Sequence, residues 1–403
     1  MTNVTKSTVE TVILDGAVSQ DFLWSAATGA HQTEGNNVAS NWWTLEHRSD
    51  TFVREPSGDA VDSYHRWAED MDIAAGAGLR DYRFGIEWSR VEPEDGHISH
   101  AAIAHYQRMV SGCRQRGLQP FVSLHHFTVP RWFADTGGWL RDDAVQRFSA
   151  YVEAVLPVLA GVRHIGTINE PNMVAMFATL AGGGPDQLAG GLPLPDPRVA
   201  EVMVTAHRHV RAKLKAALPE AMVGWGVSVQ DVQALPEATG LVQDYVEARD
   251  GVFLWAAVDD DWVGVQTYTR IRLGNNDGAP VEVLDGQTRT TLSGWEYYPS
   301  ALGGAVRRVA LAVPGVQIIV TENGIATADD DERIDYTRGP PHSLRSAIAD
   351  GVEVGGYLHW SLLDNYEWGD YRPTFGLVAV DRTTFVRTPK PSLNWLGAQR
   401  PTR

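Results

Sequence analysis

The chain has 403 residues, of which 43% are hydrophobic and 21% are charged, and its formal net charge is −16 at pH 7. This composition is that of an ordinary globular protein, and barrel folds reach this length as one domain. The acidity argues against nucleic-acid and anionic-membrane partners, because binding phosphates requires clustered Lys and Arg.

The chain lacks the sequence signatures of several other classes of protein. The single cysteine, Cys113, cannot form an internal disulfide, and it falls on the apolar face of a predicted helix, where we expect it to pack. Residues 1–16 contain no apolar segment typical of a secretory signal, and no run of about 18 apolar residues predicts a membrane span. We therefore expect a cytosolic protein. No His-Glu-x-x-His or paired-cysteine motif is present, so we expect no metal and no cofactor.

Apolar periodicity alternates between that of strands and that of helices along the whole chain. The predicted strands span residues 22–28, 80–86, 118–125, 164–169, 222–229, 262–267, 318–324 and 354–362. The predicted helices span residues 61–75, 99–116, 144–159, 198–218, 241–257, 299–312 and 335–350. A loop rich in Gly and Pro at 180–197 suits a lid or rim, and 271–292 reads as an irregular hairpin that turns at Asn276–Gly278.

Eight strands, each followed by a helix or a helix-sized segment, predict a (β/α)8 TIM barrel of the α/β class. No linker, repeat or low-complexity segment divides the chain, so we expect a single domain over 1–403, with flexible ends at about 1–15 and 398–403. A doubly wound sheet is the alternative, but no Gly-rich phosphate fingerprint follows the first strand.

Polar and aromatic residues gather where the predicted strands end, which is where barrel enzymes carry their chemistry. The strand of residues 318–322 is buried by its pattern and ends in an acid, Glu322, which must be either paired or functional. Two glutamates, a cation, an amide and Trp side chains at one end of a barrel are typical of a glycoside hydrolase. The polar and aromatic residues at the predicted strand ends, among which these groups occur, are Gln32, Glu34, Arg83, His125, His126, Asn169, Glu170, Gln266, Tyr268, Glu322, Asn323, Trp360, Glu367 and Trp368.

The aromatic composition agrees with sugar binding, since the 14 Trp outnumber both the 12 Tyr and the 11 Phe. Many Trp residues stand in predicted loops beside acids or His, where core packing does not require them. A pyranose ring has an apolar C–H face that stacks on an indole. Recognition of another protein's surface is the rival explanation.

Five motifs occur in an order that resembles the family 1 glycoside hydrolases, the retaining β-glucosidases and β-galactosidases. The resemblance extends from Phe22 to Lys390. The motifs are His31–Gly35 (HQTEG), Asp81–Phe84 (DYRF), Thr167–Pro171 (TINEP), Val320–Gly324 (VTENG) and His359–Trp368 (HWSLLDNYEW).

The resemblance implies a role for each residue that matches a catalytic position. Glu170 is the expected general acid/base and Glu322 the expected nucleophile. Arg83 is the expected cation that lowers the pKa of Glu322, although a core ion pair with another acid is the alternative. Tyr268 would position the same carboxylate, and Asn169 would hold the sugar 2-hydroxyl. Glu170 must be protonated when the reaction starts, so we expect burial and the negative charge of Glu322 to raise its pKa.

The resemblance also implies a substrate-binding set, in which Glu367 decides the sugar class. A carboxylate there disfavours a 6-phosphate and favours a free 6-hydroxyl, with either orientation at C4 tolerated. Phe127 stands where the family usually has Trp, Gln266 where it usually has Asn, and 368–375 is one residue shorter than usual. The expected substrate-binding residues are Gln32, His126, Phe127, Trp295, Trp360, Glu367, Trp368 and Phe375.

The sequence thus predicts an exo-acting retaining β-glycosidase, foremost a β-glucosidase with β-galactosidase or β-fucosidase side activity, on a small β-glycoside or oligosaccharide. Transglycosylation with a specialised aglycone is the alternative within the same chemistry. A non-catalytic sugar-binding protein is disfavoured by the presence of both glutamates. A Schiff-base aldolase is disfavoured because no Lys stands at a strand end. Aglycone preference and oligomeric state are not determined by the sequence.

Overall fold

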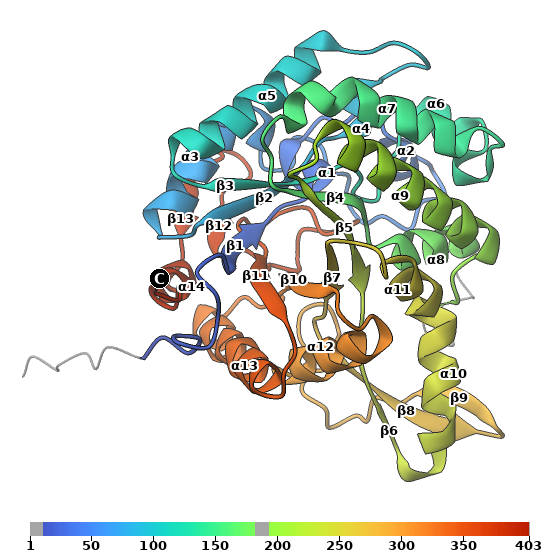
Figure 1. The fold of residues 1–403 in the computed structure, drawn as a ribbon, viewed down its shortest axis with the longest axis vertical. Coiled ribbons are helices and arrows are strands. Elements are labelled where there is room, and N and C mark those ends of the chain that lie inside the picture. Colours follow the sequence, from blue (N-terminus) through green and yellow to red (C-terminus); the bar gives the residue numbers. More distant parts are fainter. Residues whose placement is uncertain (1–10, 182–192, 403) are drawn as a thin grey trace, which may run out of the picture.

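The computed structural model describes residues 11–181 and 193–402, and its centre is a closed barrel of eight parallel strands (Figure 1). Around the barrel the strands follow the order β1-β11-β10-β7-β5-β4-β3-β2. The (β/α)8 prediction is confirmed, and the doubly wound alternative is wrong because the sheet closes on itself. The barrel strands are β1 (Leu23–Ala27), β2 (Asp81–Gly85), β3 (Gln119–Ser123), β4 (His164–Asn169), β5 (Met222–Ser228), β7 (Trp262–Gln266), β10 (Gln317–Asn323) and β11 (Val354–Trp360).

Helices surround the barrel, and the predicted ones are present with shifts of a few residues at their ends. The expected helix over 241–257 is interrupted by a π-helical turn, η4 (Glu247–Gly251), between α10 (Val242–Val246) and α11 (Val252–Ala256). The other main helices are α3 (Ser63–Gly76), α5 (His100–Gln115), α7 (Ala144–Leu159), α8 (Pro171–Ala181), α9 (Pro197–Ala217), α12 (Ala301–Ala312), α13 (Asp330–Ala349) and α14 (Pro391–Ala398). Shorter turns of helix are α1 (Ala30–Glu34), α2 (Asn41–Glu46), α4 (Trp88–Val91), α6 (Arg131–Asp135), η1 (Gly138–Leu140) and η3 (Pro236–Leu241).

Two small sheets lie outside the barrel. The predicted hairpin is confirmed as β8 (Arg270–Asn276) and β9 (Ala279–Glu282), and β8 also pairs with a strand that the periodicity did not reveal, β6 (Asp231–Ala234). With α10 these strands form the projection at the lower right of Figure 1. The second sheet pairs β12 (Val378–Val380) with β13 (Arg387–Pro389).

The two faces of each barrel strand have different surroundings, and this separation positions the site. On β2, Tyr82 and Phe84 point outward into the core between strands and helices, whereas Arg83 between them points into the barrel lumen. The floor of the lumen is filled by apolar side chains from five strands, namely Leu23, Phe121, Trp262, Ile319 and Leu358. A side chain such as Arg83 is therefore held above a packed floor and directed toward the carboxyl ends of the strands.

The ends of the chain are packed where the structure describes them. Ile13 and Leu14 are buried, and the Ile13 N–H donates to the side chain of Gln399, itself 2% exposed. The residues around Ile13 and Gln399, which belong to the expected flexible ends, are therefore packed in the folded protein. Most of the expected lid at 180–197 lies outside the described residues. Among the residues that are described, no helix is long and apolar enough to cross a membrane.

Candidate active site

Glu322 stands near the end of β10, and its carboxylate is held by three donors, one on β2 and two at or just after the end of β7. Its Oε1 accepts from Arg83 at 2.7 Å and from the Gln266 amide at 2.9 Å. Its Oε2 accepts from the Tyr268 hydroxyl at 2.5 Å. The residue is 4% exposed, so these contacts replace most of its hydration. The sequence predicted that Glu322 would be either paired or functional, and these contacts show that it is paired.

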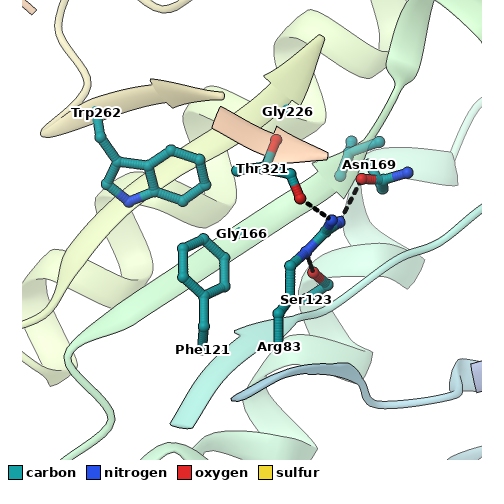
Figure 2. A pocket seen from close by; sticks show the side chains of 9 residues that line it. Arg83, Phe121, Ser123, Gly166, Asn169, Gly226, Trp262 and Thr321 are labelled. Carbon is teal, nitrogen blue, oxygen red and sulfur yellow. Dashed lines mark hydrogen bonds between the residues drawn. The ribbon is translucent and has the colours of Figure 1, made fainter. Parts of the chain in front are cut away.

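The Arg83 guanidinium, shown in Figure 2, connects four strands at the centre of the site. Besides Glu322 it donates to the Ser123 hydroxyl at 3.1 Å, to the Thr321 carbonyl at 2.9 Å and to Asn169 Oδ1. Because all of these partners are buried, Arg83 has one well-defined orientation. The alternative of a core ion pair with a different acid is therefore wrong.

Glu170 follows β4 and precedes α8, and its backbone has the left-handed φ of 45° that non-glycine residues seldom adopt. Its N–H donates to the Gly226 carbonyl on the neighbouring strand at 2.8 Å, which holds this conformation. Ser228, at the end of β5, lies close enough to this carboxyl to oppose part of the rise that burial causes in its pKa. Asn172 fixes Ser228 in turn, since its amide bonds both the carbonyl and the N–H of that residue at 2.9 and 3.2 Å.

The surroundings of the two glutamates separate their pKa values in the order that acid/base and nucleophilic roles require. Burial, followed by the negative charge of Glu322, raises the pKa of Glu170 well above its ordinary value. Burial also raises the pKa of Glu322, but the charge of Arg83 and the Tyr268 hydrogen bond lower it. Glu322 therefore ionises before Glu170. Arg83 opposes the effect of burial on Glu322 rather than giving it an unusually low pKa.

Gln32, His126 and Glu367 line the other side of the site, where some of their polar groups have no hydrogen-bond partner among the described residues. Gln32 donates to Glu367 Oε2 at 3.3 Å, and Trp360 Nε1 lies 3.4 Å from the same oxygen. Within the described part of the chain, Gln32 Oε1 and His126 Nδ1 are buried without a hydrogen-bond partner. Burial, followed by the charge of Glu322, raises the pKa of Glu367 to about 8, so this carboxyl can both donate to and accept from a hydroxyl.

Aromatic rings form two walls around these polar groups. On one side the ring of Trp368 lies 4.8 Å from Phe127 and 6.0 Å from His126 between centroids. On the other side Tyr268 lies 5.4 Å from Trp295 and 5.8 Å from Phe375. All residues expected in the substrate-binding set thus lie around one site, with Trp295 at its exposed edge.

Some residues at the strand ends do not reach this site. Glu34 pairs with Arg90 and Tyr106, and burial raises its pKa to about 7. His125 packs its ring against Trp139 on the outer side of the barrel. The Asn323 amide supports the strand ends, since it donates to the Thr267 carbonyl at 2.7 Å. These three belong to the supporting structure.

Two contacts were missed by the sequence reasoning. Gln266 was expected among the strand-end residues and as a departure from the usual Asn, but the direct contact of its amide with Glu322 was not predicted. His31 stacks parallel to Trp368 at 5.8 Å and pairs with the buried Glu46 at 3.0 Å. The position of Gln266 at the end of a strand placed it near the site but did not identify its partner, whereas nothing in the sequence indicated the His31–Glu46 pair.

Comparison with known proteins agrees with this arrangement. The model of glycosyl hydrolase family 1 matches residues 15–257 and 257–399. The thermostable beta-glucosidase B of Thermobispora bispora is 30% identical, over 93% of this chain and 88% of the relative. The bifunctional beta-D-glucosidase/beta-D-fucosidase of Bifidobacterium breve is 29% identical, over 93% and 96%. The solved apo structure of beta-glucosidase 1317 superposes with a TM-score of 0.84 at 38% identity, over 93% of this chain and 97% of that one. The chain therefore belongs to glycosyl hydrolase family 1.

Proposed function

We propose that this protein is an exo-acting retaining β-glucosidase that removes terminal non-reducing β-D-glucosyl residues by double displacement. The observation that carries this proposal is the pair of buried glutamates with separated pKa values, one of them held by Arg83 and Tyr268. A carboxylate that stays ionised beside a carboxyl that stays protonated is the arrangement that the reaction needs. The relatives named as beta-glucosidases support the choice of glucosides.

In the first step, Glu322 attacks the anomeric carbon while the bond to the leaving oxygen breaks and Glu170 gives that oxygen its proton. The charge of Glu322 disappears when it becomes an ester. The pKa of Glu170 then falls, because the charge of Glu322 is one of the causes that raise it. In the second step Glu170 takes a proton from water as the water attacks the anomeric carbon, and the Glu322 carboxylate leaves.

The remaining residues bind the sugar in this proposal. The Asn169 amide holds the 2-hydroxyl, a contact that strengthens at the transition state. Gln32, His126 and Glu367 bind the hydroxyls of the non-reducing sugar, and the walls of Trp295, Phe127, Trp360, Trp368 and Phe375 exclude water. Because Glu367 both donates and accepts, galactosides and fucosides are expected as weaker substrates, in agreement with the relative named for both glucoside and fucoside activity. The cytosolic location stays a prediction.

The test is a panel of aryl β-glycosides with cellobiose and lactose, followed by inactivation with a 2-deoxy-2-fluoro glucoside. We expect hydrolysis of the glucosides and a covalent label on the peptide that contains Glu322. The Glu322→Ala variant should lose activity and regain part of it with azide. A label on another residue, or wild-type activity in Glu322→Ala, would overturn the mechanism.

A further inference from the structure

A hydrogen-bonded pair of buried side chains, His31 and Glu46, adjoins the sugar-binding residues and has no role in the reaction proposed above. His31 Nε2 lies 3.0 Å from Glu46 Oε1, and both side chains are 0% exposed. His31 directly precedes Gln32 on α1, and Glu46 is the last residue of α2. The pair therefore joins the two short helices that follow the first barrel strand.

Glu46 is ionised although it is buried. Burial acts to raise its pKa, but the hydrogen bond with His31 and two hydrogen bonds from Ser57 lower that pKa below its ordinary value. The Ser57 N–H and hydroxyl donate to Glu46 Oε2 at 3.1 and 2.8 Å. One carboxylate oxygen is thus held by His31 and the other by Ser57. A buried charge depends on such donors, because they replace the water that it has lost.

The Ser57 side of this carboxylate leads to the loop after β11, which carries two of the proposed sugar-binding residues. The N–H groups of Arg54 and Glu55 both donate to the Gly369 carbonyl of that loop, at 3.0 and 3.3 Å. The Tyr371 hydroxyl donates in turn to the Ser57 carbonyl. The loop is therefore bonded to the segment that the buried carboxylate fixes.

The His31 side of the pair leads to the same loop by a second route. The His31 ring lies parallel to the Trp368 ring, at an interplanar angle of 3° and with centroids 5.8 Å apart. The Asn37 amide lies 3.1 Å from His31 Nδ1, so both ring nitrogens are bonded. Gln32, the next residue in the chain, donates to Glu367 Oε2 at 3.3 Å. One buried pair thus contacts, or lies one residue from, groups on both sides of this bond.

We propose that His31 and Glu46 are positioning residues that set the placement of Glu367 relative to Gln32, and through it the selection of the sugar. Neither His31 nor Glu46 is exposed to a ligand, so both act through the residues that they hold. Placement matters because a displacement of about 1 Å in a site can cost about 10²-fold in rate. This inference rests on the proposed β-glucosidase function, in which Gln32 and Glu367 bind sugar hydroxyls.

The experiment compares 4-nitrophenyl β-glucoside with 4-nitrophenyl β-xyloside, which have the same leaving group. The xyloside lacks the hydroxymethyl group that Glu367 is expected to bind. The ratio of the two kcat/KM values does not depend on the fraction of protein that is folded, so a loss of stability alone leaves it unchanged. His31→Phe keeps a ring beside Trp368 but removes the donor to Glu46, and the ratio should fall by about 10-fold.

A conservative variant separates the hydrogen bond from the ring. In His31→Gln the amide nitrogen is the same number of bonds from the backbone as Nε2 of the histidine, so the bond to Glu46 can form without a ring. This variant should keep most of the wild-type ratio. Ser57→Ala removes only a hydroxyl donor to Glu46, and it should lower the ratio in the same direction by less, including where His31→Phe does not fold.

Two further variants test the route and the specificity of the effect. In a Glu367→Ala background, His31→Phe should change the ratio no further, because the pair acts through Glu367. His65→Phe is the matched control, since it replaces a histidine of α3 whose side chain is 76% exposed, and it should leave the ratio unchanged.

An unchanged ratio in both His31→Phe and Ser57→Ala would overturn the inference. A loss in His31→Gln as large as that in His31→Phe would also overturn it, because the hydrogen bond to Glu46 would then not be the cause. The proposed function would still stand in either case, because it fails only if wild-type protein hydrolyses no glucoside and Glu322 takes no label.

Discussion

The Gln266 amide nitrogen lies 2.9 Å from Oε1 of Glu322 and donates to the same oxygen that accepts from Arg83. It also donates to Asn169 Oδ1 at 2.6 Å. One side chain at the end of β7 thus connects the proposed nucleophile on β10 with the proposed 2-hydroxyl contact on β4. Donors arranged in this way before the substrate binds stabilise the carboxylate without reorganisation during the reaction.

Replacing Gln266 by Met removes this donor while keeping the length of the side chain. Hydrogen bonds to charged groups contribute about 1.5–3 kcal/mol, so we expect kcat/KM for an aryl glucoside to fall about 10- to 100-fold. The carboxylate of Glu322 loses a stabilising partner, its pKa rises, and the acidic limb of the pH profile moves to higher pH. Gln266→Asn, which keeps an amide on a shorter side chain, should lose less. An acidic limb that stays in place in Gln266→Met would show that the amide does not act on Glu322.

Removing the proposed acid should affect substrates according to their leaving groups. In Glu170→Ala the departing oxygen receives no proton, which costs about 10²–10⁴-fold for a poor leaving group such as an alkyl alcohol. A 2,4-dinitrophenolate leaves without protonation, so formation of its glycosyl-enzyme should be almost unchanged. Pre-steady-state kinetics with both kinds of glucoside measures the difference. Equal losses would argue against the acid role.

The pH dependence of kcat/KM should follow the two raised pKa values. Glu170 acts only when protonated, so activity is present below its raised pKa and lost as the pH rises through it. Glu322 acts only when ionised, so activity is lost as the pH falls through its own pKa. With a dinitrophenyl glucoside, Glu170→Gln should lack the alkaline limb. If the limb is unchanged, it belongs instead to Glu367, whose pKa is raised to about 8.

Gly324 is required because of a close approach and not because of an unusual φ. A Cβ at this position would lie 1.9 Å from the Trp360 carbonyl oxygen, so alanine must displace the end of β10 or β11. We expect Gly324→Ala to lower kcat and to destabilise the fold by about 1–3 kcal/mol, measured by urea unfolding. Gly76→Ala is the matched control, since a Cβ there meets no atom within 4 Å. Wild-type activity in Gly324→Ala would contradict the geometry.

The C-terminal strand β13 is joined to α3 by a buried ion pair. Arg387 Nε lies 2.8 Å from Asp70, and both side chains are 0% exposed. Arg387→Ala leaves the Asp70 charge buried without its partner, which should lower the free energy of unfolding by about 3–5 kcal/mol. Arg48→Ala removes an exposed pair with Asp50 and should leave stability unchanged. Thermal or denaturant unfolding of the two variants distinguishes these outcomes, and equal midpoints would contradict the prediction.

Much of the fold could be predicted because strands, helices and tight turns leave patterns within short stretches of sequence. Tyr82, Arg83 and Phe84 alternate between apolar and charged side chains, a pattern that puts the arginine on the opposite face of the strand from its neighbours, and the structure places it in the lumen beside Glu322. The hairpin turn at Asn276–Gly278 was likewise visible in the residues themselves. The elements that were missed, such as β6, are short and half-buried, so neither periodicity nor composition distinguishes them from a loop.

The candidate residues around Glu170 and Glu322 were predicted because parallel strands bring their carboxyl ends to one rim. Which of those residues meet was decided only by the closed barrel. Strand register brings Gln266 to Glu322, turns His125 outward and leaves Glu34 with Arg90, although all three lie at or shortly after the end of a strand in the sequence. A cavity of about 80 Å³ likewise needs α8, β6, α10 and β8 together, since Met173, Val232, Val246 and Ile271 all line it. Patterns with periods of two and 3.6 residues are local and readable in the sequence, whereas contacts across the lumen depend on how distant segments pack.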